Sequence, residues 1–197
     1  KNPKDLAVPM RVVGGKFGGT VLAAPKGRTT RPTGERTREA LFSILEARPD
    51  YSLANARVLD LFAGTGALGL EALSRGADFR LCVEHDTRVR GVFRAGCEAC
   101  DVIGRSKIYR RDATRLDART SSAGPPFDLV FADPPYGKAL AEAALTAIAQ
   151  GNWLASNALV VVEEDRRAAF TPPVDFTQSE RRTYGDTELV FLEFSTS

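Results

Sequence analysis

A glycine loop that follows an apolar strand constrains this chain more than any other feature. Residues 58–62 (VLDLF) predict a buried strand, and Gly64, Gly66 and Gly69 follow it with the spacing G-x-G-x-x-G. An acid, Glu84, lies twenty residues beyond Gly64, at the end of the next predicted strand. This spacing is typical of a dinucleotide site at the edge of a parallel sheet, although by itself it does not separate NAD from other adenosine-bearing cofactors.

Strands and helices are expected to alternate beyond this loop. The pattern predicts strands at residues 80–84, 107–110, 129–132 and 159–163, and helices at residues 68–75, 87–100 and 138–150. Such alternation indicates an α/β fold with a doubly wound, mostly parallel sheet.

Both ends of the chain depart from this pattern. Residues 10–13 and 20–23 predict a β-hairpin around a Gly-rich turn, and residues 35–47 predict an amphipathic helix. Near the other end, residues 177–184 and 188–194 flank Gly185-Asp186 and predict a closing hairpin. We therefore expect a loose tail at residues 1–9, an extension at residues 10–50 and a cofactor-binding domain at residues 51–197.

The bulk composition excludes several classes of protein. A chain of 197 residues has room for one well-buried domain, and no apolar run approaches the ~20 residues that a membrane span needs. No signal peptide is visible, and three cysteines, Cys82, Cys97 and Cys100, are an odd number that disfavours a disulfide framework. These features favour a cytoplasmic protein without membrane attachment.

Positive charge is concentrated near the start of the chain. Residues 1–48 contain ten Lys and Arg against four Asp and Glu, although the whole chain has a net charge of only +2. A basic segment on a mildly acidic body suggests contact with a polyanion. The alternative is a solvated surface with a chance imbalance.

The acid Asp60 distinguishes between the candidate cofactors. A dinucleotide would bring a pyrophosphate to the glycine loop, where a carboxylate one strand-end away would oppose it. S-adenosylmethionine has no phosphate and carries a cationic sulfonium and an ammonium group, so Asp60 favours this cofactor. Glu84 would accept hydrogen bonds from the ribose hydroxyls, and Asp112 would meet the adenine edge. The remaining cofactor candidates are loop or neighbouring residues: Phe62, Ala63, Thr65, His85 and Ala113.

A second motif, Asp133-Pro134-Pro135-Tyr136, directly follows the predicted strand at residues 129–132. Two prolines stiffen the chain at the sheet edge where ligands bind. The exocyclic amine of guanine or adenine is a poor nucleophile, because its lone pair is delocalised into the ring. The Asp133 carboxylate and the Pro134 carbonyl are expected to accept its two hydrogens and aim the lone pair at the methyl group, while Tyr136 offers a stacking face for an extruded base.

These motifs resemble the bacterial 16S rRNA guanine-N2 methyltransferases, the family named for guanine 966. The similarity includes residues 59–77 and the tetrad, and it covers about residues 10–194. Its other motifs are residues 11–15 (RVVGG), 30–33 (TRPT), 36–42 (RTREALF) and 184–187 (YGDT).

The resemblance implies a class I methyltransferase fold, Rossmann-like, with a seven-stranded sheet whose last strand is antiparallel and a small N-terminal β-hairpin. It implies S-adenosylmethionine as cofactor, S-adenosylhomocysteine as product, no metal, and 16S rRNA of the small ribosomal subunit or its assembly intermediate as substrate. A monomer is expected. Phosphate contacts are then predicted for basic residues of the extension: Lys16, Arg28, Arg31, Arg36 and Arg38.

Three other functions remain open from the sequence. A DNA adenine-N6 methyltransferase would use the same tetrad, but most carry a recognition domain for which this length leaves little room. A protein glutamine methyltransferase shares the amide-nitrogen chemistry and would not need the basic extension. A non-catalytic ribosome assembly factor would retain the fold without turnover.

Overall fold

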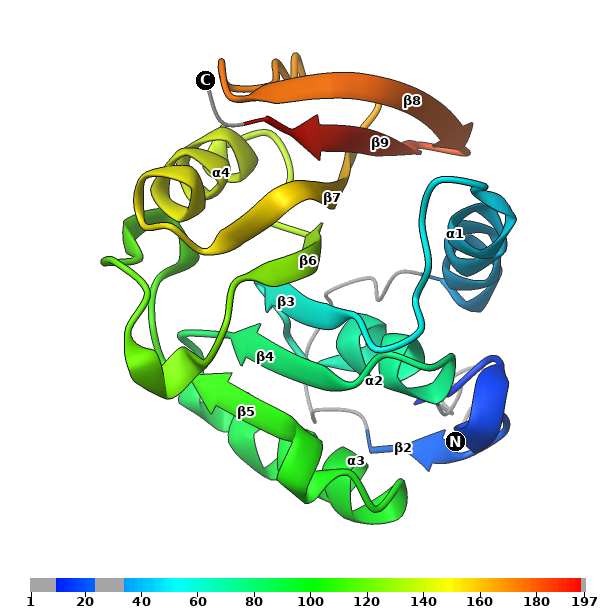
Figure 1. Ribbon diagram of the computed structural model, residues 1–197. Helices are drawn as coiled ribbons and strands as arrows, with labels where there is room; N and C mark the ends of the chain where they lie inside the picture. Colours follow the sequence, from blue (N-terminus) through cyan, green and yellow to red (C-terminus); the bar gives the residue numbers. More distant parts are fainter. Residues whose placement is uncertain (1–9, 24–33, 196–197) are drawn as a thin grey trace, which may run out of the picture.

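The apolar runs of the sequence form a seven-stranded mixed sheet in the order β5-β4-β3-β6-β7-β9-β8 (Figure 1). The computed structural model describes residues 10–23 and 34–195. The strands of the large sheet are β3 (Arg57–Leu61), β4 (Phe79–Val83), β5 (Ser106–Tyr109), β6 (Phe127–Ala132), β7 (Leu154–Asp165), β8 (Phe176–Tyr184) and β9 (Thr187–Phe194).

The helices are α1 (Glu35–Ala47), α2 (Ala67–Ser74), α3 (Arg90–Ala99) and α4 (Leu140–Gln150). Short 3-10 turns are η2 (Gly15–Phe17), η3 (Thr87–Val89), η4 (Ile103–Arg105), η5 (Ala113–Arg115) and η6 (Ser121–Ala123). No helix in the described part of the chain combines the length and the apolar character that crossing a membrane requires.

Strand β9 is the antiparallel strand of the large sheet. It pairs antiparallel with β7 on one side and with β8 on the other, whereas the pairs from β5 through β7 are all parallel. The turn between β8 and β9 uses Gly185 at φ +62°, a left-handed conformation that glycine adopts without steric cost. The predicted doubly wound sheet with an antiparallel last strand is confirmed.

The chain reverses its direction of travel across the sheet at β3. Strands β4 and β5 lie on one side of β3, and β6 and β7 lie on the other. Ligands of open α/β sheets bind at the carboxyl ends of the strands at such a switch point, because the loops there diverge and leave a crevice. The glycine loop after β3 and the tetrad after β6 therefore meet at this crevice.

Two apolar clusters cover the two faces of the sheet. On one face, Val58 packs in a cluster with Phe42 of α1 and Phe93 of α3. On the other face, Leu59 packs in a cluster with Leu145 of α4. Because neighbouring residues of β3 serve opposite clusters, the central strand is buried on both sides, which explains its continuous apolar run.

The N-terminal hairpin is part of this core. Strands β1 (Met10–Arg11) and β2 (Val21–Leu22) pair antiparallel, as predicted, and Met10 and Leu22 belong to the same apolar cluster as Val58. The described parts of the extension, residues 10–23 and 34–50, thus share a core with the sheet, and the domain boundary at residue 50 remains a prediction from sequence.

Helix α2 holds the hairpin by polar contacts. The buried carboxylate of Glu71 accepts hydrogen bonds from the backbone N–H groups of Val13 (2.7 Å) and Gly14 (2.8 Å). The hydroxyl of Ser74 accepts one from the N–H of Phe17 (2.8 Å) and donates one to the carbonyl of Gly14 (2.5 Å). These bonds satisfy backbone groups of a hairpin whose two-residue strands offer few partners of their own.

Two predicted elements differ from the observed ones. The helix expected at residues 87–100 begins with the 3-10 turn η3, in which the Asp86 side chain caps the N–H of Arg88, before α3 starts at Arg90. Strand β7 extends beyond the predicted residues 159–163 at both ends. Near the start of β7 the pairing with β6 shifts register, and Asn157 has a φ of +61°. The extra residues at this irregularity interrupt the apolar pattern on which the prediction was based.

Candidate active site at the carboxyl edge of the sheet

The glycine loop makes a tight left-handed turn directly after β3. Phe62, Gly64 and Gly66 have φ values of +57°, +53° and +74°, and Gly66 caps the start of α2. A left-handed conformation at a bulky non-glycine residue such as Phe62 carries strain that the surrounding structure must offset, and such strain clusters at functional sites. The loop is tied to β4 by a bond from the N–H of Ala63 to the carbonyl of Val83 (3.1 Å).

The three glycines of the loop are required for different structural reasons. A Cβ on Gly66 would lie 3.0 Å from Arg80 Nη1 and 3.2 Å from the Phe93 ring, and a Cβ on Gly69 would lie 3.1 Å from Asp60 Oδ2. These two positions need glycine because the chain packs closely beneath the loop. A Cβ on Gly64 would meet only the carbonyl of Phe62, at 4.0 Å, so the chain itself leaves space at that position for a ligand to approach.

A buried acid and a buried arginine support the loop from below. Asp60 Oδ2 accepts hydrogen bonds from the N–H of Gly69 (3.0 Å) and the thiol of Cys82 (3.9 Å). Arg80 Nη1 donates to the carbonyl of Gly66 (2.6 Å). Burial raises the pKa of Asp60 to about 7, against the opposing effects of the Gly69 hydrogen bond and the positive charge of Arg80. The sequence predicted Asp60 as a site residue but did not predict Arg80. In the sequence, Arg80 looks like an ordinary charged residue within a strand.

Glu84, at the end of β4, is oriented by the backbone on both sides. Its Oε2 accepts from the N–H of Gly64 (2.9 Å), and its Oε1 accepts from the N–H of Asp86 (2.8 Å). A carboxylate has about four acceptor positions, so two remain for hydroxyl donors. The ring of His85 lies largely in solvent, with Nδ1 3.4 Å from Glu84 Oε1.

Asp112 follows β5 and caps the turn η5. Its Oδ1 accepts from the N–H (2.9 Å) and the hydroxyl (2.7 Å) of Thr114, and these bonds hold the pKa of Asp112 below its usual value. Asp112 is exposed, whereas the next residue, Ala113, is buried in the apolar cluster of α4. The exposed carboxylate is thereby fixed at the same sheet edge as Glu84.

The tetrad lies beside the glycine loop. Strands β3 and β6 are neighbours, with Leu61 paired to Ala132, and the N–H of Asp133 approaches the carbonyl of Leu61 at 3.5 Å. Pro134 is buried, whereas Pro135 and Tyr136 are exposed. The two motifs that the sequence singled out, more than sixty residues apart, therefore meet at one edge.

Strand β7 and the hairpin of β8 and β9 anchor the tetrad. The hydroxyl of Tyr136 donates to Glu163 Oε1 (3.0 Å) and lies 3.4 Å from the hydroxyl of Thr187. The N–H of Gly137 donates to Glu164 Oε1 (3.1 Å). Sequence reasoning missed Glu163 and Glu164, although two acids at the end of a predicted parallel strand are a usable signal. Thr187 lies in the YGDT motif that supported the family resemblance.

The structure describes three of the five residues predicted to bind phosphate, and two of these three lie at the surface. Lys16 and Arg36 are exposed, and Arg28 and Arg31 lie outside the described residues. The prediction for Arg38 is wrong: its side chain is 2% exposed, and its Nη2 donates to the carbonyl of Arg11 (2.7 Å). Burial lowers the pKa of Arg38. The helical spacing could have indicated that Arg38 is buried, because it lies on the same face of α1 as the buried residues Leu41, Phe42 and Leu45.

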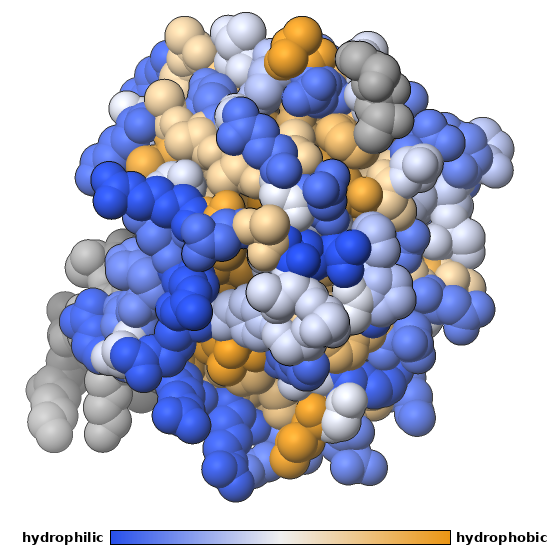
Figure 2. All heavy atoms as spheres, turned by 60° about the vertical axis from the view of Figure 1, so that its left-hand side comes forward, coloured by the Kyte–Doolittle hydropathy of each residue, from blue (hydrophilic) through white to orange (hydrophobic). Residues whose placement is uncertain are grey.

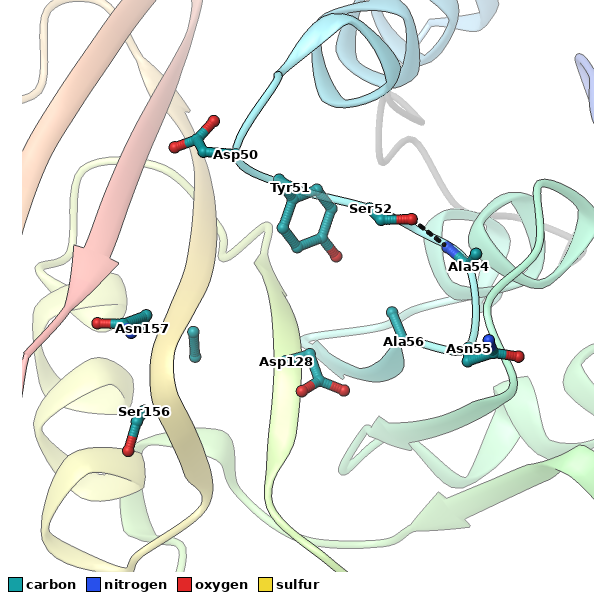
Figure 3. A pocket seen from close by; sticks show the side chains of 10 residues that line it. Asp50, Tyr51, Ser52, Ala54, Asn55, Ala56, Asp128, Ser156 and Asn157 are labelled. Atoms are coloured by element: carbon teal, nitrogen blue, oxygen red, sulfur yellow. Dashed lines mark hydrogen bonds between the residues drawn. The ribbon is translucent and has the colours of Figure 1, made fainter.

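The pocket drawn in Figure 3 lies at the amino ends of the strands, opposite the carboxyl ends that carry the glycine loop and the tetrad. It has a volume of about 310 Å³, and its lining includes Tyr51, Ala56 and Asp128, at the amino ends of β3 and β6. It is therefore separate from the crevice formed by the glycine loop and the tetrad. Within the described residues, no group of three or more His, Cys, Asp and Glu side chains is arranged to hold a metal ion.

Strand order, glycine loop and tetrad together define the class I methyltransferase fold. Residues 10–193 match the family described as "Conserved hypothetical protein 95", and the chain belongs to this family. The relationship predicted from the sequence is confirmed by the relatives below.

The chain is 35% identical over 156 residues to "Ribosomal RNA small subunit methyltransferase D" of Escherichia coli K12, covering 79% of this chain and 75% of the relative. It is 33% identical over 177 residues to "Putative rRNA methyltransferase YlbH" of Bacillus subtilis, covering 89% of this chain and 94% of the relative. A solved structure described as "Putative methyltransferase yhhF from Escherichia coli" has a TM-score of 0.80 at 28% identity, covering 96% and 100% of the two chains.

Proposed function

We propose that this protein transfers a methyl group from S-adenosylmethionine to the exocyclic N2 of a guanine in 16S rRNA of the small ribosomal subunit. The observation that carries the proposal is the pairing of β3 with β6, which places Asp133 beside Leu61, the residue from which the glycine loop starts. The names of the curated relatives support RNA of the small subunit as the substrate class.

The residues at the crevice fit this cofactor. Gly64 leaves open space above the loop, and Glu84 is held by two backbone N–H groups with acceptor positions to spare for ribose hydroxyls. Asp112, held at the same edge by Thr114, is assigned to the adenine. When bound, the cofactor supplies an electrophilic methyl group on a cationic sulfonium, and the buried charge of Asp60 favours a cationic ligand.

The chain supplies orientation and charge stabilisation at the target amine. The Asp133 carboxylate and the Pro134 carbonyl accept the two hydrogens of the guanine amine and direct its lone pair toward the methyl carbon. The nitrogen–carbon bond forms as the carbon–sulfur bond breaks. The methylated nitrogen then loses one proton to solvent, and S-adenosylhomocysteine is the second product.

Tyr136 provides a stacking face for the extruded base. It is 39% exposed, and its bond to Glu163 fixes the ring. Burial and the neighbouring Glu163 raise the pKa of Tyr136, so its hydroxyl stays neutral and acts as a donor. Stacking on an aromatic ring is worth roughly 1–3 kcal/mol per base.

The direct test is to incubate the protein with radiolabelled S-adenosylmethionine and small subunits from cells that lack the family enzyme. We expect the label in N2-methylguanosine after digestion of the RNA. Label in N6-methyladenosine would retain the mechanism and overturn the assignment to guanine. Bound cofactor with no label in RNA would favour a protein substrate or an assembly factor.

A matched pair of variants tests the role of Asp133. Asp133→Asn keeps the shape and removes the negative charge, and Asp133→Ala removes both. Loss of one such transition-state contact typically lowers kcat by 10²–10³. We expect both variants to lose transfer to about that extent while calorimetry shows affinity for S-adenosylhomocysteine within a few-fold of wild type. Equal loss of turnover and affinity would contradict the assigned role.

A further inference from the structure

A groove of about 610 Å³ runs along the free edge of strand β5. Strand β5 pairs only with β4 among the described strands, so its other edge is open. The groove is bordered by three arginines, Arg90 at the start of α3 and Arg110 and Arg111 directly after β5. None of the interactions that define the glycine loop or the tetrad uses these residues.

The floor of the groove is apolar and rigidly held. Trp153 and Tyr109 contact each other edge to face, with ring centroids 6.3 Å apart. The indole N–H of Trp153 donates to the carbonyl of Asp117 (2.9 Å), and the Tyr109 hydroxyl shares a hydrogen bond with Ser122 (2.7 Å). Trp153 is 3% exposed and supports the floor from beneath, so the half-buried ring of Tyr109 provides the aromatic surface. Because this ring is already fixed, a ligand that contacts it need not order it on binding.

The three arginines are available for a ligand. Arg90, Arg110 and Arg111 are exposed, and none forms an ion pair with a described residue. Their neighbours differ in this respect: Arg88 binds Asp86 at 2.8 Å and Arg94 binds Glu98 at 2.8 Å. Against these three charges, the groove lining contains one acid, Asp117.

The groove lies next to the carboxyl ends of the strands, where the cofactor is expected to bind. Asp112, assigned to the adenine, directly follows Arg111 in the chain. Strands β5 and β6 are separated by β4 and β3, so three strand spacings of ~4.8 Å place the groove about 14 Å from the tetrad across the sheet. Figure 2 looks toward this side of the molecule, where the surface is mostly hydrophilic and apolar residues are visible in hollows.

We infer that this groove binds the phosphodiester backbone of the RNA that flanks the target nucleotide. Unpaired arginines over an aromatic floor match the way proteins follow single-stranded nucleic acid, with cations on phosphates and aromatic side chains beneath. A protein partner fits less well, because protein interfaces are depleted of charge at their centre. The inference rests on the proposed function and adds a second RNA contact, separate from the basic residues of the N-terminal extension.

The test combines two variants with a charge-matched control. Arg110→Ala/Arg111→Ala removes two charges from the groove, and Arg90→Ala removes one from a different element. The control, Arg94→Ala/Arg167→Ala, also removes two charges, from side chains that are 77% and 71% exposed and paired with Glu98 and Asp165. All of these side chains lie at the surface, so thermal unfolding should change little.

Binding is measured with protein-free small-subunit rRNA over a range of salt concentrations, and cofactor binding with S-adenosylhomocysteine. We expect the double groove variant to weaken RNA binding roughly tenfold relative to the control and to reduce the slope of log K against log salt by about 1.4, the value for two contacts to single-stranded phosphates. Arg90→Ala should lower the slope by about half as much. Affinity for S-adenosylhomocysteine should stay within twofold.

Three outcomes would overturn the inference. RNA affinity equal to that of the control would exclude phosphate contact, and parallel loss of cofactor affinity would assign the arginines to the cofactor site. A defect seen with assembled subunits but not with naked RNA would indicate a ribosomal protein as the occupant. Failure of the proposed function looks different, because wild-type protein would then bind RNA through the groove without methylating it.

Discussion

The hydroxyl of Tyr136 lies 3.0 Å from Glu163 Oε1, and this hydrogen bond joins the loop after β6 to the carboxyl end of β7. The acceptor is 5% exposed, so the bond forms away from bulk solvent, where it is worth more than at the surface. Strand β7 thereby fixes the orientation of the aromatic ring that is assigned to the target base.

Glu163 is therefore expected to act as a positioning residue. Tyr136→Phe should lower kcat/KM for RNA by about 3–10-fold, because the ring remains and its anchor is lost, and Tyr136→Ala should lower it about 10–100-fold through lost stacking. Glu163→Ala should match Tyr136→Phe. The two changes should be non-additive in a double-mutant cycle measured by methyl transfer, and additive effects would show that Glu163 acts independently of Tyr136.

The loop glycines should separate cofactor binding from folding. Gly64→Ala adds a methyl group to the open space above the loop, so affinity for S-adenosylhomocysteine should fall at least tenfold while the left-handed backbone costs about 1–2 kcal/mol of stability. Gly66→Val should instead unfold the region, since its side chain collides with Arg80 and Phe93. Thermal unfolding and calorimetry on the same samples distinguish the two, and normal cofactor affinity in Gly64→Ala would contradict the loop assignment.

Cofactor affinity should depend on pH through Asp60. Burial raises the pKa of Asp60 to about 7, so its charge is lost as the pH falls through 7 and a cationic ligand binds more weakly. Because the folded-state pKa lies above the unfolded value of 3.8, the contribution of Asp60 to stability is fully present below pH 3.8 and is lost as the pH rises through about 7.

Titration of cofactor binding between pH 5.5 and 8.5, a range chosen to extend roughly 1.5 units to either side of that pKa, tests this dependence. Asp60→Asn should bind S-adenosylmethionine more weakly at pH 8 and show a flatter profile. An unchanged profile in Asp60→Asn would assign the pH dependence to another group.

The hairpin should depend on Glu71. Glu71→Gln leaves one backbone N–H facing an amide nitrogen, so the free energy of unfolding should fall by about 1–3 kcal/mol in denaturant titrations. Glu71 also forms an ion pair with Arg75 at 2.9 Å. Glu46→Gln is the matched control, because Glu46 pairs with the same Arg75 at 3.0 Å but is 48% exposed. It should cost less than about 1 kcal/mol. Equal losses in both variants would place the effect in Arg75 rather than in the hairpin.

The sequence by itself determined the order of the elements and the two motifs of the site. Strand and helix periods are local properties, and the glycine spacing and the stiff Asp133–Tyr136 segment each lie within a few residues. Parallel strands also bring their carboxyl ends to one edge, so the meeting of the two motifs follows from the strand pattern. For these reasons the sequence alone is sufficient to predict the fold and the family.

Only the tertiary structure decided which polar side chains act together. Tyr136 and Glu163 are 27 residues apart, and Glu71 reaches Val13 across 58 residues. The burial of Arg38 and the exposure of Arg90, Arg110 and Arg111 also depend on which remote elements pack against them. Burial and hydrogen-bond partners arise from the packing of segments distant in sequence, whereas a sequence pattern reports mainly the preferences of each segment alone.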